Sequence, residues 1–171
     1  NLTHWKAGRE IDAIGKVVTP GFIDPHVHHD GAMITQPDME FMTSQGVTTI
    51  INGNCGFSIA PLKNTSRMPD ALRMIVDNDE LAFSSYAAYR DRIAGAPAAV
   101  NAACLIGHST LRINELSDLG KPADADQTKA MCHQLDKALG EGAIGLSTGT
   151  FYPPSRAAPT EELIALARVA Q

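Results

Sequence analysis

The chain of 171 residues is 44% hydrophobic and carries a formal net charge of −5, with its 14 basic residues spread along the sequence. This composition is sufficient for one buried core, and it lacks the basic patch that marks a nucleic-acid-binding protein. No apolar run approaches the roughly 18 residues that cross a bilayer, so we expect a soluble protein without a membrane partner.

Cysteine usage and the two ends of the sequence add two expectations. The cysteines Cys55, Cys104 and Cys132 are odd in number and widely spaced. This pattern argues against a disulfide framework and favours the reducing cytoplasm. The sequence starts at Asn1 without a signal-peptide pattern and stops at Gln171 inside a helical pattern. We therefore expect a fragment of a longer protein, and its oligomeric state stays open.

Two βα units are predicted in the first half of the chain. Residues 21–28 and 46–56 are rich in apolar or small residues and end in polar or glycine-rich sequence, as buried strands of a parallel sheet do. A helix is predicted in residues 37–46, with its proline near the start and its glycine at the end. A longer helical stretch, expected to contain more than one helix, lies between Pro69 and Gly95.

Two more βα units follow, with strands predicted in residues 98–109 and 142–154. The helix predicted in residues 126–142 has one apolar face, formed by Met131, Leu135, Ala138 and Leu139. The last helix is predicted to begin at Thr160, with Glu161 and Glu162 favourably placed in its first turn. Its apolar stripe is expected to comprise Leu163, Leu166, Ala167 and Ala170.

A strand followed by a helix, four times over, implies a parallel α/β sheet. A doubly wound sheet and a (β/α)₈ barrel both satisfy this pattern. In either fold, ligands bind at the carboxyl ends of the strands. His26, His28, Cys55, His108 and residues 148–152 all lie at such ends. The functional site is therefore expected there.

His26 and His28 alternate along the first predicted strand. Alternate strand residues point to the same side, roughly 6.6–7 Å apart, so both imidazoles can converge on one metal ion. Asp24 shares their parity, whereas Ile23 and Val27 are expected to point toward the helices. A solvated histidine-rich loop, or a histidine held in the core by a hydrogen bond, is the alternative.

Cys55 ends the second predicted strand, in the polar turn of residues 52–56. A thiolate beside two imidazoles is a good ligand set for a borderline-soft ion such as Zn²⁺. The alternative is a buried, unreactive cysteine, which is what we expect for Cys104 and Cys132.

Four motifs carry a family resemblance. TPGFIDPHVHHD resembles the first-strand signature of the amidohydrolase superfamily, metal hydrolases built on a (β/α)₈ TIM barrel. Three further motifs resemble one branch of this superfamily, the N-acyl-D-amino-acid deacylases (D-aminoacylases). They are GVTTIINGNCGFSIAPL, NAACLIGHSTLR and GAIGLSTGTFYPP. The motifs run in order from about Val17 to Glu162, which is nearly the whole chain.

The resemblance implies a domain organisation. Residues 20–171 would form the first half of the metal-dependent hydrolase barrel, about four βα units. Residues 1–19 would be a lead-in, or a stub of the small β-domain that these enzymes usually carry.

The resemblance also implies the metal ligands. These are His26, His28 and Cys55, the cysteine being the ligand that can bridge two metal positions. Much of the superfamily instead uses a carboxylated lysine from the fourth strand, but residues 142–154 contain no lysine. Hydantoinase and dihydroorotase types are thereby disfavoured. The deacylases commonly have HxHDD where this sequence has His29 in place of the first aspartate, and we expect His29 beside the ligands or facing solvent rather than as a ligand.

Substrate-binding residues are expected at Tyr152 and His108. Tyr152 resembles a pocket residue that contacts the acyl group or the scissile amide, with ordinary loop packing as the alternative. His108 is placed for an active-site wall, with a structural hydrogen bond as the alternative. Arg112 is a candidate to meet a carboxylate, with a surface or helix-terminal arginine as the commoner case. His4 and His133 are expected at the surface.

The implied reaction is zinc-dependent hydrolysis of an N-acyl-D-amino acid, a small-molecule substrate, to a carboxylate and a D-amino acid, by attack of metal-activated water on the amide carbonyl. The general acid/base of the superfamily is an aspartate of the eighth strand, expected beyond Gln171, and Asp24 or Asp30 is not expected to replace it. We therefore predict that the isolated 171 residues do not deacylate N-acetyl-D-methionine.

Two alternatives to this function stay open. One is another amidohydrolase-superfamily enzyme, such as an isoaspartyl dipeptidase or a cyclic-amide hydrolase. The other is a non-catalytic, truncated remnant.

Overall fold

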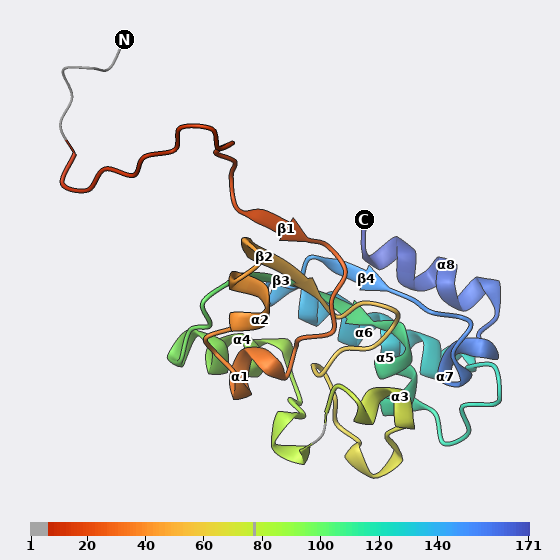
Figure 1. The fold of residues 1–171 in the computed structure, drawn as a ribbon. Coiled ribbons are helices and arrows are strands. Elements are labelled where there is room, and N and C mark those ends of the chain that lie inside the picture. The colour runs from red at the N-terminus through yellow and green to blue at the C-terminus, as the bar shows by residue number, and fades with distance from the viewer. Residues whose placement is uncertain (1–6, 77) are drawn as a thin grey trace.

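The computed structural model describes residues 7–76 and 78–171, and its centre is a four-stranded sheet (Figure 1). The strands are β1 (Phe22–Asp24), β2 (Val47–Asn52), β3 (Asn101–Gly107) and β4 (Gly145–Ser147). They pair in the order β1-β2-β3-β4, and each neighbouring pair is parallel. The prediction of successive parallel βα units is confirmed.

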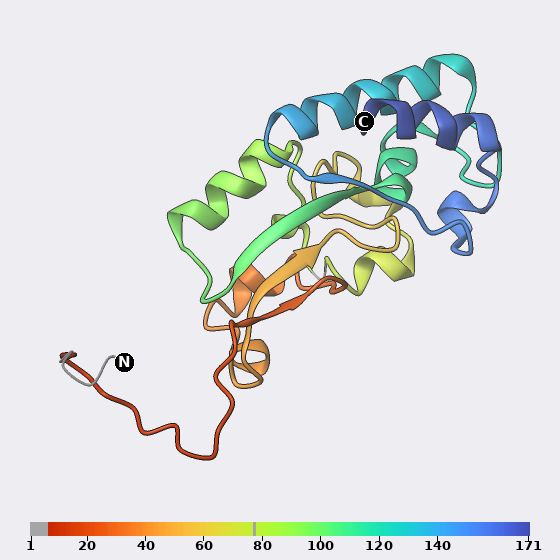
Figure 2. The same ribbon diagram turned by 90° about the horizontal axis from the view of Figure 1, so that it is seen from above.

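Helices connect the strands, and Figure 2 shows α4, α6 and α8 on the same side of β3 and β4. The α-helices are α1 (Ala32–Thr35), α2 (Glu40–Thr43), α3 (Asp70–Arg73), α4 (Tyr86–Gly95), α5 (His108–Glu115), α6 (Ala125–Gly140), α7 (Pro153–Arg156) and α8 (Thr160–Val169). Short 3₁₀ helices cover Thr65–Arg67 and Asp79–Leu81. In the described part of the chain, no helix is both long enough and apolar enough to cross a membrane.

Helix α6 agrees closely with its prediction. Asp124 accepts a hydrogen bond from the Gln127 backbone N–H (2.8 Å), and the Gln127 side chain accepts one from the Asp124 backbone (3.0 Å). This reciprocal pair satisfies two donors that the first helical turn leaves free. Met131, Leu135 and Ala138 are buried as predicted. They belong to the main hydrophobic core, which also includes Cys104 and Ile106 of β3.

Helix α8 begins at Thr160 as predicted, but its buried face is rotated. Leu166 is fully buried, whereas Ala167 and Ala170 are exposed, so the predicted stripe is wrong at these two alanines. The reason is Glu162, which lies one turn before Leu166 and is itself buried. The buried Glu162 carboxylate therefore selects a buried helix face that the apolar residues alone do not predict.

Strand β1 is shorter than predicted and ends at Asp24. The Asp24 carboxylate accepts a hydrogen bond from the His26 backbone N–H (3.1 Å), which closes a bend just after the strand. The chain still runs beside β2, because the Val27 N–H donates to the Ile51 carbonyl (3.2 Å). Val27 is buried as expected, but Ile23 is 64% exposed, because β1 lies at the edge of the sheet.

The intervening helices were predicted with mixed success. The stretch between Pro69 and Gly95 contains α3, a 3₁₀ turn and α4, as expected, and α2 lies within the predicted helix of residues 37–46. Helices α1, α5 and α7 were not predicted. Helix α7 begins at Pro153, so its first two residues fall in the range 142–154 assigned to a strand, because its two prolines supply the backbone angle of a first helical turn.

Candidate metal centre

The side chains of His26, His28 and Cys55 converge just beyond the carboxyl ends of β1 and β2. Their potential ligand atoms all lie within 4.8 Å of one another. His26 Nε2 is 3.1 Å from Cys55 Sγ, and the centroids of the two imidazole rings are 5.7 Å apart. Zn–N and Zn–S bonds of about 2.0–2.3 Å place ligands of one ion roughly 3–4 Å apart, so small side-chain rotations close this cluster on one ion. The donor set fits zinc.

The turn that presents Cys55 has an unusual backbone. Cys55 has a φ of +55°, and the flanking Gly53 and Gly56 have φ of +75° and +82°. Such angles are uncommon for a residue with a Cβ atom and persist where the surroundings hold the chain in place. The strained residue of this turn is the one whose thiol faces the histidines.

Two buried asparagines hold the histidine segment against the end of β2. The Asn54 side-chain amide donates to the Val27 carbonyl (3.2 Å), and the His29 N–H donates to the Asn52 side-chain oxygen (3.0 Å). These bonds fix the backbone groups before and after His28. The polar turn predicted from the sequence therefore also carries the groups that orient a neighbouring side chain.

Burial and neighbouring charge set the protonation of the histidine segment. Burial lowers the pKa of His28, and repulsion from the His26 and His29 imidazoles lowers it further. This favours the neutral imidazole, the form that binds metal ions. Burial raises the pKa of Asp30 to about 7, although backbone hydrogen bonds from its own N–H and from Gly53 oppose the shift.

Neither aspartate nor His29 joins the cluster formed by His26, His28 and Cys55. Asp24 caps the bend, as described above. Asp30 is buried, and its Oδ2 has no hydrogen-bond partner among the described residues. The His29 ring is half-buried, and its centroid lies 4.9 Å from that of Phe41.

A cavity of about 270 Å³ opens beside the cluster. Besides His28 and Cys55, it is lined by side chains that are mostly apolar: Phe57, Ala71, Met74, Ile75 and Tyr152. The Tyr152 ring also packs edge-on against Phe57, with centroids 5.2 Å apart. Tyr152 therefore lines the cavity together with His28 and Cys55, and it also makes the packing contact given as its alternative.

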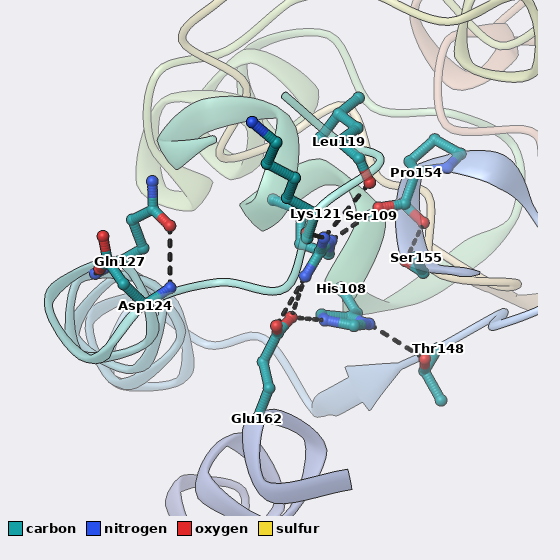
Figure 3. A network of polar contacts seen from close by, with 11 residues as sticks. His108, Ser109, Leu119, Lys121, Asp124, Gln127, Thr148, Pro154, Ser155 and Glu162 are labelled. Atoms are coloured by element: carbon teal, nitrogen blue, oxygen red, sulfur yellow. Dashed lines mark hydrogen bonds and ion pairs between the residues drawn. The ribbon is translucent and has the colours of Figure 1, made fainter. Parts of the chain in front are cut away.

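His108 is fully buried, and both of its ring nitrogens have partners. Nδ1 lies 3.1 Å from the Thr148 hydroxyl, and Nε2 donates to the Glu162 carboxylate (2.6 Å). Figure 3 shows Glu162 extending from α8 to the imidazole, with Thr148 on the other side of the ring. These contacts match the structural hydrogen bond given as the alternative for His108.

Arg112 is fully buried, so the surface position is wrong, whereas the carboxylate partner given as the other possibility is present in Glu162. Its guanidinium forms a two-bond ion pair with Glu162 (2.6 and 2.7 Å) and donates to the Pro154 carbonyl (2.6 Å). Burial by itself raises the pKa of Glu162, but the hydrogen bonds from His108 and Arg112 outweigh it and hold the pKa below its ordinary value. One sequence signal was available: Glu162 lies four residues before Leu166, hence on the same helix face.

Among the described residues, the remaining cysteines and histidines lie outside the cluster of His26, His28 and Cys55. Cys104 is buried, and burial raises the pKa of its thiol to about 12, as expected for an unreactive cysteine. Cys132 is half-buried in α6. His133 is exposed as predicted, and His4 lies outside the described residues.

Parallel βα units with two histidines and a cysteine at the carboxyl ends of adjacent strands define a metal-binding βα-barrel protein. A sequence model described as the amidohydrolase family matches residues 9–171. The chain belongs to this family.

Three relatives show how far the similarity extends. The chain is 44% identical over 168 residues to the D-aminoacylase of Alcaligenes xylosoxydans xylosoxydans, a match that covers 98% of this chain and 34% of the relative. A solved D-aminoacylase structure, from work on its binuclear metal center, matches with a TM-score of 0.94 and 46% identity, over 99% of this chain and 35% of that one.

An N-acyl-D-glutamate deacylase of Bordetella bronchiseptica, solved with zinc and a phosphonate mimic of the tetrahedral intermediate, matches with a TM-score of 0.84 and 38% identity, over 88% of this chain and 31% of that one. The chain therefore spans about a third of the length of these relatives. The predicted fold class, about four βα units of an amidohydrolase TIM barrel, is confirmed.

Proposed function

We propose that the protein hydrolyses N-acyl-D-amino acids to a carboxylate and a D-amino acid, with zinc held by His26, His28 and Cys55. The observation that carries the proposal is the convergence of these three side chains, within 4.8 Å, beside a cavity that His28 and Cys55 line. The similarity to D-aminoacylase supports the choice of an N-acyl-D-amino acid.

A bound zinc ion supplies Lewis-acid chemistry, since it polarises an amide carbonyl and lowers the pKa of water from 15.7 to about 7. The chain's own residues would hold the ion and orient its ligands. The neutral His28 imidazole presents a lone pair, while Asn52 and Asn54 fix the backbone on its two sides. Hydrogen bonds that orient metal ligands in this way typically strengthen metal binding.

The cavity suggests how the substrate lies. Tyr152 is proposed to contact the acyl group or the scissile amide, because its side chain lines the cavity together with His28 and Cys55. Phe57 and Met74 line the same cavity, and this apolar lining favours an uncharged group of the substrate. His108, with both nitrogens engaged, is proposed to act on substrate through the loop that carries Thr148 and Tyr152.

We also propose the domain organisation and the cellular location. Residues 20–171 are assigned to the first half of the barrel, and residues 1–19 to a lead-in or a stub of the small β-domain. A cytoplasmic location is supported by the free thiols of Cys55, Cys104 and Cys132, since a thiolate ligand persists in a reducing compartment.

The test uses two proteins: the one encoded by the reading frame that contains this sequence, and the 171-residue chain by itself. Each is loaded with Zn²⁺ and supplied with N-acetyl-D-methionine, its L-enantiomer and N-acetyl-D-glutamate. We expect release of D-methionine by the reading-frame protein only, with the L-enantiomer untouched and the glutamate substrate slower. Equal hydrolysis of both enantiomers, or none of any substrate, would contradict the proposed activity.

The ligand set is tested separately by metal analysis. Cys55→Ala is expected to lower the zinc content of the purified protein, and Cys132→Ala serves as the matched control because its thiol lies outside the cluster. Unchanged zinc in the Cys55 variant would remove this cysteine from the site.

A further inference from the structure

Ser147, the last residue of β4, touches both sides of the turn that carries Cys55. Its hydroxyl donates to the Gly53 carbonyl oxygen and accepts a hydrogen bond from the Gly56 N–H (3.0 Å). Gly53 and Gly56 lie two residues before and one residue after the cysteine. A single hydroxyl, more than 90 residues away in sequence, therefore closes this turn.

The turn depends on such support. Cys55 has a φ of +55°, a conformation that costs free energy for a residue with a side chain. The loop after β4 also presses on the turn, because a Cβ atom on Gly149 would overlap the Cys55 carbonyl oxygen. The Thr110 N–H, in the first turn of α5, donates to the Gly56 carbonyl (3.3 Å). The start of α5 and the end of β4 thus both contact the turn, and Ser147 contacts it at two points.

We propose that Ser147 is a positioning residue of the metal centre, which keeps the Cys55 thiol facing His26. The inference rests on the ligand role of Cys55 in the proposed function. The hydrogen bonds of the Ser147 hydroxyl go to the backbone on either side of Cys55, so Ser147 acts through that backbone. Groups that orient metal ligands typically contribute about 10–100-fold to metal affinity.

A matched control lies in the same part of the chain. The Ser155 hydroxyl is also hydrogen-bonded, to the Ser109 hydroxyl (2.6 Å), and Ser155 is fully buried. It contacts neither the Cys55 turn nor the histidine segment through any hydrogen bond of its side chain. Ser155→Ala removes a comparable hydrogen bond and leaves the proposed positioning contact in place.

The experiment compares wild type, Ser147→Ala, Ser147→Thr and Ser155→Ala in the purified protein. Zn²⁺ affinity is measured by competition with a chelator, and Co²⁺ loading reports the thiolate-to-metal charge-transfer absorption. Thermal unfolding of the metal-free proteins reports stability. We expect Ser147→Ala to lower Zn²⁺ affinity by about 10–100-fold and to weaken the cobalt–thiolate absorption. Ser147→Thr, which keeps the hydroxyl, is expected to bind like wild type, and Ser155→Ala to lose stability without losing affinity.

Three results would overturn the inference. They are wild-type affinity in Ser147→Ala, an equal loss of affinity in Ser155→Ala, and a loss in Ser147→Thr as large as that in Ser147→Ala. Cys55→Ala separates the two proposals. Unchanged zinc binding in Cys55→Ala would refute both the proposed metal site and the role of Ser147. Weak binding in Cys55→Ala together with normal binding in Ser147→Ala would refute the role of Ser147 only.

Discussion

Arg112 brings a guanidinium into the interior of the protein, where an unpaired charge is very costly. Its donors reach the Glu162 carboxylate and the carbonyl oxygens of Pro154 and Lys121, all within 2.7 Å. His108 also donates a hydrogen bond to Glu162 Oε1, one of the two carboxylate oxygens that Arg112 contacts. The charges are therefore paired, and removal of Arg112 or Glu162 leaves the other of the two buried without its counter-charge.

Arg112→Met is expected to lower the free energy of unfolding by about 3–5 kcal/mol, the usual cost of breaking a buried ion pair. The matched control is Arg90→Met, because Arg90 forms its ion pair with Asp91 while both side chains are more than half exposed. Exposed pairs contribute about 0–1 kcal/mol. Urea denaturation measures both variants, and similar losses would show that burial of the Arg112 pair contributes nothing extra.

Acidification is expected to destabilise the fold through Glu162. Its native pKa lies below the ordinary 4.5, so the unfolded chain binds the proton more tightly than the native protein. The contribution of the carboxylate to stability is thus complete above pH 4.5 and declines as the pH falls toward the native pKa. Urea midpoints measured at a series of pH values from about pH 6 downward should fall less steeply in Glu162→Gln than in wild type. Parallel curves would contradict this assignment.

At the scale of elements, α8 shows how one charged residue sets the orientation of a helix. Glu162 and Leu166 point inward together, and Ile164 is left 46% exposed. The apolar residues of α8 alone are consistent with more than one face. The contact with α6 and the ion pair with Arg112 select the observed one.

Truncation of Leu166 tests that orientation. Leu166→Ala is expected to cost about 2–5 kcal/mol of unfolding free energy, because the residue is fully buried and its removal leaves a cavity. Ile164→Ala, on the exposed side, is expected to cost clearly less. Chemical denaturation of both variants measures the difference, and the opposite ranking would refute the observed orientation of α8.

At the scale of the whole molecule, the sheet ends in β1 and β4, each of which pairs with one strand in the described part of the chain. Phe22 and Ile23 of the edge strand β1 are 56% and 64% exposed. An exposed apolar edge strand is a template for pairing with another chain. The 171-residue chain is therefore expected to self-associate.

Ile23→Lys is expected to raise the monomeric fraction of the 171-residue chain, because a lysine on an edge strand opposes strand pairing. Ile164→Lys is the control, since it places the same charge on an exposed helical position. Light scattering over a concentration series measures association. An equal effect of the two substitutions would assign the association to general hydrophobicity instead of the β1 edge.

The sequence by itself determined the βα order, the parallel sheet and the buried face of α6. These features depend on the local periodicity of apolar residues, which can be read from the sequence without knowledge of tertiary contacts. The amidohydrolase resemblance indicated His26, His28 and Cys55, and the structure brings these three together within 4.8 Å. The strand-parity argument for the histidine pair was wrong in its detail, because Asp24 closes a bend before His26.

Only the tertiary structure decided the contacts that join residues distant in the sequence. Arg112 and Glu162 are 50 residues apart, and Ser147 is 91 residues from Gly56, so no local pattern relates them. Whether a charged or polar side chain is buried depends on which partners the packed strand ends bring within hydrogen-bond distance. That is why a surface position was the commoner case for Arg112 in the sequence, and why the support of the Cys55 turn by Ser147 became visible only in the folded chain.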